Sequence, residues 1–303
     1  MPPGLYEYKI TRGGWDKVEC TGNGASIGNR QLKLGSDTVI FIDVEGWQDK
    51  FSLNGRKSTA SSHVKIIAAP FYIPQLKRTR RIWIYLPDDY NASKKRYPVL
   101  YMNDGQNVFE DTTAYSGEWG VDEFLDSVKT TKCIVVAVDH GGDKRLNEYS
   151  PYDMEKFGKG EGRQYVDFMV KTLKRYIDKR YRTLPDRQNT FIAGSSMGGL
   201  ISMYAILRYP KVFGGAGIFS PAFWVAPGIF DEIQAKGSKV RGNLFFYAGK
   251  KESETMVPLM IKAFGGMAAV SHARLQTLVR DDGKHNESAW RKEFPLFYDW
   301  ILR

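Results

Sequence analysis

Short apolar runs that alternate with helix-like segments occupy the chain from about residue 64 onward. Residues 133–138 carry no polar side chain other than a thiol, and residues 190–193 and 244–248 are almost as apolar. Strands of this kind have no face for water, so they belong to a parallel sheet that helices cover on both faces. The pattern therefore predicts an α/β fold with a mostly parallel central sheet. Further strands are expected at 64–69, 80–86, 99–102, 213–219 and 275–279, and helices at 121–128, 161–181, 197–209 and 288–302.

The first 60 residues follow a different pattern. Two short alternating runs, at 5–10 and 38–44, are separated by clusters of Gly and Asn, and no helical period is present. Short strands between turn signals are typical of a small β module. We therefore expect two domains, a partial β-sandwich over residues 1–60 and an α/β catalytic domain over residues 61–303. So short a module has a small core, and we expect it to be incomplete at its N-terminus.

Composition and charge exclude several classes of protein. The chain has 303 residues, 42% of them hydrophobic, and no apolar run approaches the ~20 residues of a membrane helix. Its net charge is +10, densest over residues 77–96 and 171–187. The second cluster lies on a helical pattern with one apolar stripe, which favours a solvated face over a nucleic-acid site. No zinc-finger, Walker or RNA-binding motif is present, so we predict neither a nucleic-acid nor a membrane partner.

The sequence offers no ligand set for a cofactor. Its two cysteines, Cys20 and Cys133, lie far apart, and no cluster of His, Cys, Asp and Glu has metal-ligand spacing. We therefore expect no metal and no cofactor. The first residues lack the basic and apolar regions of a secretory signal, so a periplasmic or secreted location would require a truncated N-terminus. The sequence predicts neither compartment nor oligomeric state.

Residues 194–198, Gly-Ser-Ser-Met-Gly, match the G-x-S-x-G pattern with Ser196 at its centre. A predicted strand enters this turn and a predicted helix leaves it. Such an elbow strains the backbone at its serine and leaves no room for side chains at the flanking positions, which explains Gly194 and Gly198. It also places the Met197 N–H at a helix N-terminus, where it can bind an oxyanion. We interpret Ser196 as the nucleophile of a hydrolase; the alternative is a Gly/Ser-rich turn without chemistry.

A serine nucleophile needs a base, and the chain has four histidines. In an α/β-hydrolase the order along the chain is serine, acid, histidine, with the base on the loop after the last strand. His285 fits this order. His272 precedes the last strand, His63 lies in the linker and His140 precedes the serine. His285 is therefore the predicted base.

The acid of such a site should follow the strand at 244–248. The next loop carries Glu252 and Glu254, and we favour Glu252 because it lies nearer the strand end. The acid would hold the imidazole tautomer and stabilise the imidazolium; a Ser–His dyad without an acid is the alternative. A second oxyanion donor should come from the loop after residues 99–102, where a glycine lets the next N–H turn inward, so Gln106 is the candidate.

Segments that leave the carboxyl ends of the strands should line the substrate pocket. They are rich in aromatic residues, whose flat rings suit a planar acyl group or a sugar face better than a flexible chain. We therefore expect a partly aromatic pocket; the alternative is that several rings, Trp119 and Trp290 first, fasten loops to the core. The aromatic residues of these segments are Phe109, Tyr115, Trp119, Phe223, Trp224 and Trp290, and the residues expected to contact substrate are Asp104, Asn107, His140, Trp224 and Trp290.

Four stretches of the chain resemble the esterase D family of α/β-hydrolases, which includes feruloyl, acetylxylan and siderophore esterases and S-formylglutathione hydrolases. The resemblance spans about residues 64–303 and implies Ser196 as nucleophile, His285 as base and Glu252 at the acid position, which is often Asp in this family. It also implies Gln106 and Met197 as oxyanion donors. The four stretches are residues 97–107, 145–151, 194–199 and 285–290.

The first 60 residues resemble part of an immunoglobulin-like, starch-binding-type module that precedes such esterases in some bacteria. Residues 3–15 carry this resemblance. Trp15 and Trp47 are candidates for stacking on sugars, with core packing as the alternative.

Together these features predict a serine carboxylesterase that acts through an acyl-enzyme on carbohydrate-linked acetyl or feruloyl-type esters. Its partner would be a small-molecule or polysaccharide-linked ester. Three alternatives remain open: a siderophore esterase or S-formylglutathione hydrolase-like thioesterase, an acyltransferase with the same triad, and a non-catalytic carbohydrate-binding protein. The intact set of Ser196, Glu252 and His285 argues against the last.

Overall fold

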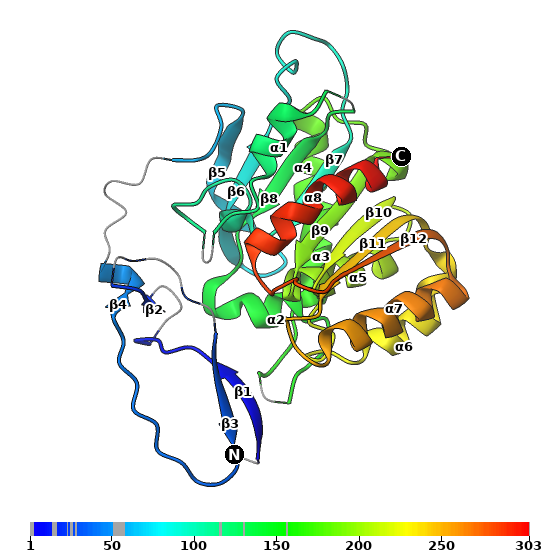
Figure 1. Cartoon of the computed structure of the whole chain (residues 1–303). Helices are drawn as coiled ribbons and strands as arrows, with labels where there is room; N and C mark the ends of the chain where they lie inside the picture. Colours follow the sequence, from blue (N-terminus) through cyan, green and yellow to red (C-terminus); the bar gives the residue numbers. More distant parts are fainter. Residues whose placement is uncertain are drawn as a thin grey trace.

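An eight-stranded sheet forms the centre of the computed structural model, which describes residues 3–13, 17–22, 24, 27, 29–50, 58–114, 117–129, 131–155 and 157–302 (Figure 1). The six strands from β12 to β8 run parallel, and β6 and β5 complete one edge in antiparallel pairing. The predicted fold class, an α/β-hydrolase with a mostly parallel sheet, is confirmed. In spatial order the strands are β12 (His272–Arg280), β11 (Arg241–Gly249), β10 (Gly215–Phe219), β9 (Thr190–Ser195), β7 (Val99–Asn103), β8 (Ile134–Val138), β6 (Arg78–Tyr85) and β5 (Val64–Ile73).

Helices cover the sheet on both faces, and the strands bury alternate residues against each layer. On β8, Ile134 and Val136 pack into one core while Val135 and Ala137 pack into the other. A period of two with apolar residues on both sides explains why this segment contains no polar residue. α1 (Val121–Ser127) and α8 (Glu287–Ile301) lie on one face; α2 (Arg145–Tyr149), α3 (Gly162–Phe168), α4 (Lys174–Arg180), α5 (Met197–Arg208), α6 (Ile229–Lys236) and α7 (Met256–Val270) belong to the other.

Two differences from the predicted helices concern their extent and number. The long helix expected at 161–181 is α3 and α4 joined by a π-helical segment, Met169–Leu173. The sequence did not predict the helices α2, α6 and α7. No helix among the described residues is long and apolar enough to cross a membrane.

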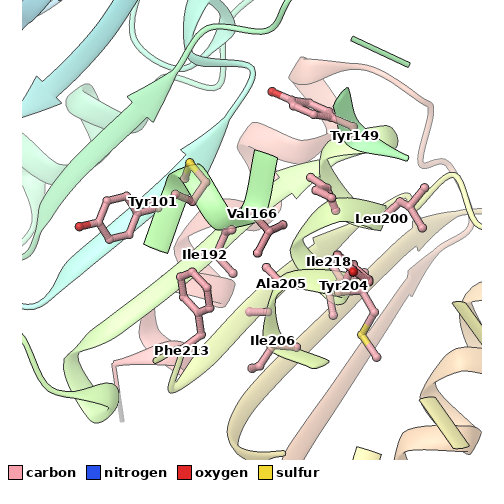
Figure 2. Packing of buried hydrophobic residues seen from close by; sticks show 14 of the residues in the cluster. Tyr101, Tyr149, Val166, Ile192, Leu200, Tyr204, Ala205, Ile206, Phe213 and Ile218 are labelled. Carbon is pink, nitrogen blue, oxygen red and sulfur yellow. The ribbon is translucent and has the colours of Figure 1, made fainter. Parts of the chain in front are cut away.

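Helix α5 forms the centre of the larger core (Figure 2). Leu200, Tyr204 and Ile206 pack among residues of the sheet that include Ile192 on β9 and Ile218 on β10. Each of these side chains is at most 2% exposed, and burying a side chain of this size contributes about 1.5–3 kcal/mol. This packing holds the first turn of α5, where the candidate nucleophile lies, against the strand ends.

The N-terminal residues form two small antiparallel sheets apart from the central one (Figure 1). β1 (Gly4–Tyr8) pairs with β3 (Arg30–Leu34), and β2 (Glu19–Cys20) pairs with β4 (Gly46–Trp47). The strand predicted at 38–44 is wrong, because this segment pairs with no described strand. Its apolar residues have no layer to pack against: Val39 and Phe41 are 80% and 96% exposed.

The structure describes only one of the two tryptophans that were candidates for stacking on sugars. Trp15 lies outside the described residues. Trp47 is half-buried, and the Arg12 guanidinium lies 5.0 Å from the centre of its ring. An intramolecular cation therefore already occupies one face of the Trp47 ring.

The site forms where the strand order reverses. β7 and β9 are neighbours, but the connection after β7 leads to β8 on one side and the connection after β9 leads to β10 on the other. Connections that diverge in this way open a crevice at the carboxyl ends of the two strands. Asn103, the last residue of β7, spans this point: its Nδ2 donates to the Ala193 carbonyl and to Ser202 Oγ, at 3.2 and 3.0 Å. The buried amide thus fastens β7 to β9 and to α5.

Candidate active site

The turn at Ser196 has the strained geometry that its sequence predicts. Ser196 has φ 58° and ψ −121° and lies between the end of β9 and the start of α5. A non-glycine residue in such a region costs about 1–3 kcal/mol, so its surroundings must hold it. The Ser196 N–H donates to the Phe219 carbonyl at 2.9 Å, and its own carbonyl accepts from the Ala222 N–H at 3.0 Å. A Cβ at Gly194 would lie 2.9 Å from the Gly198 carbonyl carbon, so glycine is required there.

A cavity of about 870 Å³ opens at the carboxyl ends of the strands, and Ser196, His285 and Glu252 all line it. The three residues are far apart in the chain and come from the loops after β9, β12 and β11. The structure therefore brings together the residues predicted as nucleophile, base and acid. No hydrogen bond joins Ser196 Oγ to the His285 ring in the described part of the chain; such bonds often tighten only when substrate binds.

Glu252 rather than Glu254 contacts the histidine. Glu252 Oε2 lies 2.7 Å from His285 Nδ1, and the glutamate is only 5% exposed, whereas Glu254 is an exposed loop residue. A carboxylate can only accept, so Nδ1 carries the proton and Nε2 is left with a free lone pair. The other oxygen, Oε1, accepts from the Gly249 N–H at 2.6 Å and from Ser220 Oγ at 2.7 Å.

The start of α8 determines where His285 lies. Asn286 caps the helix, since its Oδ1 accepts from the Ala289 N–H at 3.0 Å. The helix therefore begins directly after the histidine, and its first turn points into the same pocket. His285 and Trp290 of this turn contact edge to face, with ring centres 5.1 Å apart and planes at 84°.

The two predicted oxyanion donors lie on neighbouring turns, though neither residue is among those lining the cavity. Met197 is the first residue of α5, so its N–H has no acceptor within the helix. Gln106 lies in the 3₁₀ turn Gly105–Asn107 that follows β7, and its side-chain Oε1 accepts from the His140 N–H at 3.3 Å. A Cβ at Gly105 would lie 2.8 Å from the Val138 carbonyl carbon, so this turn packs directly on β8.

Polar residues dominate the rest of the pocket wall. Asp104 accepts two hydrogen bonds from the Arg145 guanidinium, at 2.6 and 2.9 Å. Glu287, 6% exposed, accepts from Asn107 Nδ2 at 2.9 Å. Burial, with Asp104 nearby, raises the pKa of Glu287 to about 7. Burial also lowers the pKa of His140, which keeps this imidazole neutral. Asp104, Asn107 and His140 line the cavity, where the sequence places substrate contacts.

Most of the aromatic residues expected to line the pocket do not. Trp224 is 58% exposed and is not among the lining residues. Phe109, Trp119 and Phe223 are buried in the two cores, and Tyr115 lies outside the described residues. Trp290 does line the cavity, but it is 4% exposed and stacks on Trp119. The rings mainly fasten the loops to the core.

The N-terminal residues supply a part of the pocket wall that the sequence did not indicate. Glu7 and Lys9, in and just after β1, line the cavity together with Asn29 and Gln31. The pairing of β1 with β3 places Glu7 opposite Gln31, and the Gln31 and Asn29 amides donate to its carboxylate at 3.2 and 3.4 Å. The alternation in the sequence shows which residues share a face of this two-stranded sheet, but not that the face meets the pocket.

The described residues contain no group of three or more His, Cys, Asp and Glu side chains arranged to hold a metal ion. What the site does contain is a serine on a strained strand–helix turn, a histidine and a buried carboxylate, all at the carboxyl ends of a mostly parallel sheet. This combination is characteristic of α/β-hydrolases.

The chain belongs to the family described as "Putative esterase", whose sequence model matches residues 73–296, and it is a carboxylic ester hydrolase. It is 27% identical over 248 residues to "Uncharacterized protein YbbA" of Bacillus subtilis, covering 73% of this chain and 92% of that protein. It is 26% identical over 238 residues to an "Endo-1,4-beta-xylanase/feruloyl esterase" of Xylanibacter ruminicola, covering 76% of this chain but only 30% of that protein. A solved structure of a ferulic acid esterase superposes with a TM-score of 0.59 at 22% identity, covering 79% of this chain and 97% of the other, and establishes the shared fold.

Proposed function

We propose that the chain is a serine esterase that forms an acyl-enzyme on Ser196. The observation that carries this proposal is the 2.7 Å contact between His285 Nδ1 and the buried Glu252 carboxylate, in the pocket that Ser196 also lines. His285 Nε2 would take the Ser196 hydroxyl proton as Oγ attacks the ester carbonyl. The tetrahedral intermediate then expels the alcohol, which receives that proton from the imidazolium. Water repeats the sequence to release the acid and restore Ser196.

The negative charge of each tetrahedral intermediate falls on the former carbonyl oxygen. We assign its stabilisation to the Met197 and Gln106 N–H groups, which belong to the turns after β9 and β7. Removing one such donor typically costs about 10²–10³ in kcat, because the site excludes water. Glu252 would keep the His285 ring in the productive tautomer and stabilise the imidazolium.

For the substrate, we propose an acyl ester of a carbohydrate, with an acetyl or feruloyl-type acyl group. The cavity volume, about 870 Å³, lies within the range of sites for organic ligands, roughly 300–1,000 Å³. Its wall is rich in carboxylate, amide and guanidinium groups, which pair with hydroxyls. The name of the Xylanibacter relative includes feruloyl esterase. In this proposal residues 1–60 act with the catalytic domain, residues 61–303, by presenting Glu7 and Gln31 to the sugar.

A panel of esters tests the mechanism and the substrate class separately. The panel contains p-nitrophenyl acetate, methyl ferulate, a feruloylated arabinose oligosaccharide, acetylxylan, S-formylglutathione and a catecholate siderophore. We expect the sugar ferulate to have a higher kcat/KM than methyl ferulate, which carries the same acyl group. A preference for S-formylglutathione or the siderophore would contradict the substrate class but leave the mechanism standing.

Two further measurements test the mechanism itself. A fluorophosphonate probe should label wild-type protein and leave the Ser196→Ala variant unlabelled in a mass spectrum. Activity should be the same with and without EDTA, and a loss that zinc restores would contradict the proposed mechanism. An added sugar alcohol that increases p-nitrophenol release and appears as its ester would instead indicate acyl transfer.

A further inference from the structure

Ser220 has no part in the steps described above, yet it is completely buried beside the acid of the site. It follows β10 directly and has φ 43°, a left-handed conformation that a non-glycine residue rarely adopts. Its Oγ donates to Glu252 Oε1 at 2.7 Å and accepts from the indole N–H of Trp290 at 2.8 Å. A chain of hydrogen bonds therefore runs from Trp290 through Ser220 and Glu252 to His285.

The backbone at the end of β10 connects this chain to the nucleophile. The Phe219 carbonyl accepts from the Ser196 N–H at 2.9 Å, and the Ser220 N–H donates to the Tyr247 carbonyl at 2.7 Å. Two consecutive residues thus hold the strained turn at Ser196 on one side and the end of β11 on the other. The loop that carries Glu252 leaves β11 two residues after Tyr247.

We propose that Ser220 and Trp290 are positioning residues that aim the Glu252 carboxylate at His285, a role that rests on the proposed serine mechanism. Ser220 and the Gly249 N–H together fix Oε1, so that Oε2 points toward the imidazole. The Trp290 ring also contacts His285 edge to face, with 5.1 Å between the ring centres. This contact restrains the orientation of the imidazole. One indole therefore constrains both partners of the acid–base pair.

The chain of hydrogen bonds also has an electrostatic consequence. The Ser220 hydroxyl donates to a carboxylate that is 5% exposed, and donors stabilise a buried anion. Without this donor, the Glu252 carboxylate interacts more strongly with the imidazolium that forms on His285 during the reaction. The rising limb of the pH–rate profile should then move to higher pH. The indole N–H strengthens the hydroxyl as a donor, because consecutive hydrogen bonds polarise one another.

Other charged and titratable groups also face the pair. They are Tyr247 on β11, Glu287 on α8, Lys251 and Lys284 in the adjoining loops, and Lys9 of the N-terminal segment. Substitutions at Ser220 and Trp290 leave all of them in place. A difference between these variants and wild type therefore reports the lost hydrogen bonds.

The test compares Ser220→Ala, Trp290→Phe and the double variant by their kcat, KM and pH–rate profiles with p-nitrophenyl acetate. We expect Ser220→Ala to lower kcat about 10- to 100-fold, with little change in KM and a rising limb at higher pH. Trp290→Phe should lower kcat about 2- to 10-fold and move the limb in the same direction. The double variant should match Ser220→Ala, because phenylalanine keeps a ring against His285 and the indole N–H acts only through the hydroxyl. Ser220→Cys, which keeps a weak donor, should lie between wild type and Ser220→Ala.

Two matched substitutions away from the site control for packing. Ser150→Ala removes another fully buried hydroxyl, which donates to the Tyr152 carbonyl. Trp300→Phe removes an indole of the same helix whose N–H has no partner among the described residues. Both should leave the pH–rate profile unchanged, whatever they do to the melting temperature.

Three outcomes would overturn the proposal. The first is a Ser220→Ala variant that melts at a lower temperature but keeps wild-type kcat and its pH–rate profile. The second is additive losses in the double variant, which would mean that the indole N–H does not act through Ser220. The third is retention of activity by Ser196→Ala, which would overturn the serine mechanism itself. An inactive Ser196→Ala beside an unaffected Ser220→Ala would overturn only the positioning role.

Discussion

Glu252 and Glu7 both line the active-site pocket, one from the loop after β11 and the other from the N-terminal strand β1. Glu252 is 5% exposed and has three partners, His285, Ser220 and the Gly249 N–H. Glu7 is exposed and accepts from the side-chain amides of Asn29 and Gln31. The same residue type is thus held in place by the core at one wall and left accessible to solvent at the other.

The difference in burial bears on what each carboxylate can do. A charge in a site that excludes water acts strongly on its neighbours, and its fixed partners need not rearrange during the reaction. An exposed carboxylate is screened by solvent and can exchange its partners for hydroxyls of a ligand. We call the wall formed by the loops after the parallel strands, which carries Glu252, the strand-end wall, and the wall formed by β1 and β3, which carries Glu7, the N-terminal wall. We therefore expect changes on the strand-end wall to lower kcat and changes on the N-terminal wall to raise KM.

The largest effect should come from Ser196, the proposed nucleophile on the strand-end wall. Ser196→Ala should lower kcat for p-nitrophenyl acetate about 10⁶-fold, because the acyl-enzyme can no longer form. Circular dichroism should remain that of wild type, since alanine fits the same turn. Retention of more than about one percent of wild-type turnover, far above that loss, would place the nucleophile elsewhere.

The next largest effect should distinguish Glu252 from Glu254, which lie in the same loop. Glu252→Gln should lower kcat by up to about 10⁴-fold, because an amide can hold the wrong imidazole tautomer. Glu254→Gln is the matched control, since Glu254 is an exposed residue two positions along the same loop. The reverse order of effects would move the acid to Glu254, and two small effects would favour a Ser–His dyad.

A third pocket glutamate, Glu287, is about as buried as Glu252, and its effect should appear in the free energy of unfolding. Glu287 is buried, and burial raises its pKa from 4.5 to about 7. Between these values the folded protein binds a proton that the unfolded chain does not, so stability falls as pH rises through this window. The free energy of unfolding, relative to Glu287→Gln, should decline on the order of 2 kcal/mol from pH 5 to pH 8.

Urea denaturation of both proteins at several pH values measures this decline. Glu118 and Asp122, whose pKa values burial raises to about 8 and about 7, remain in both proteins. Their contribution therefore cancels in the difference. Parallel stability curves for wild type and Glu287→Gln would show that Glu287 ionises as it does in the unfolded chain.

The smallest effect should come from the N-terminal wall. Substituting Glu7 and Gln31 together by alanine should raise KM for a feruloylated arabinose oligosaccharide about 3- to 10-fold, the loss of one or two hydrogen bonds. The kcat value should change less than the KM value, because neither residue takes part in the proposed chemical steps. A fall in kcat with an unchanged KM would contradict the division of roles between the two walls.

The sheet and the turn at Ser196 could be predicted from the sequence because local rules decide both. An apolar run such as 133–138 has no stable place except between two helical layers, and β8 occupies that place. A serine between two glycines, with a strand before and a helix after, has few conformations available. The strand predicted at 38–44 is wrong, because alternation is a local property and a strand also needs a partner strand and a layer of side chains to cover it.

Only the tertiary structure decided which side chains meet at the strand ends. Two glutamates in one loop look alike in sequence, yet one is 5% exposed against His285 and the other faces solvent. Likewise, nothing local shows that Ser220 reaches Glu252, or that Trp224 is exposed while Trp119 is buried. Periodicity determines which residues share a strand or a helix face, because neighbours along the chain decide it. Burial and partners depend on how distant segments pack. That packing lined this pocket mostly with polar residues, where the sequence suggested aromatic ones.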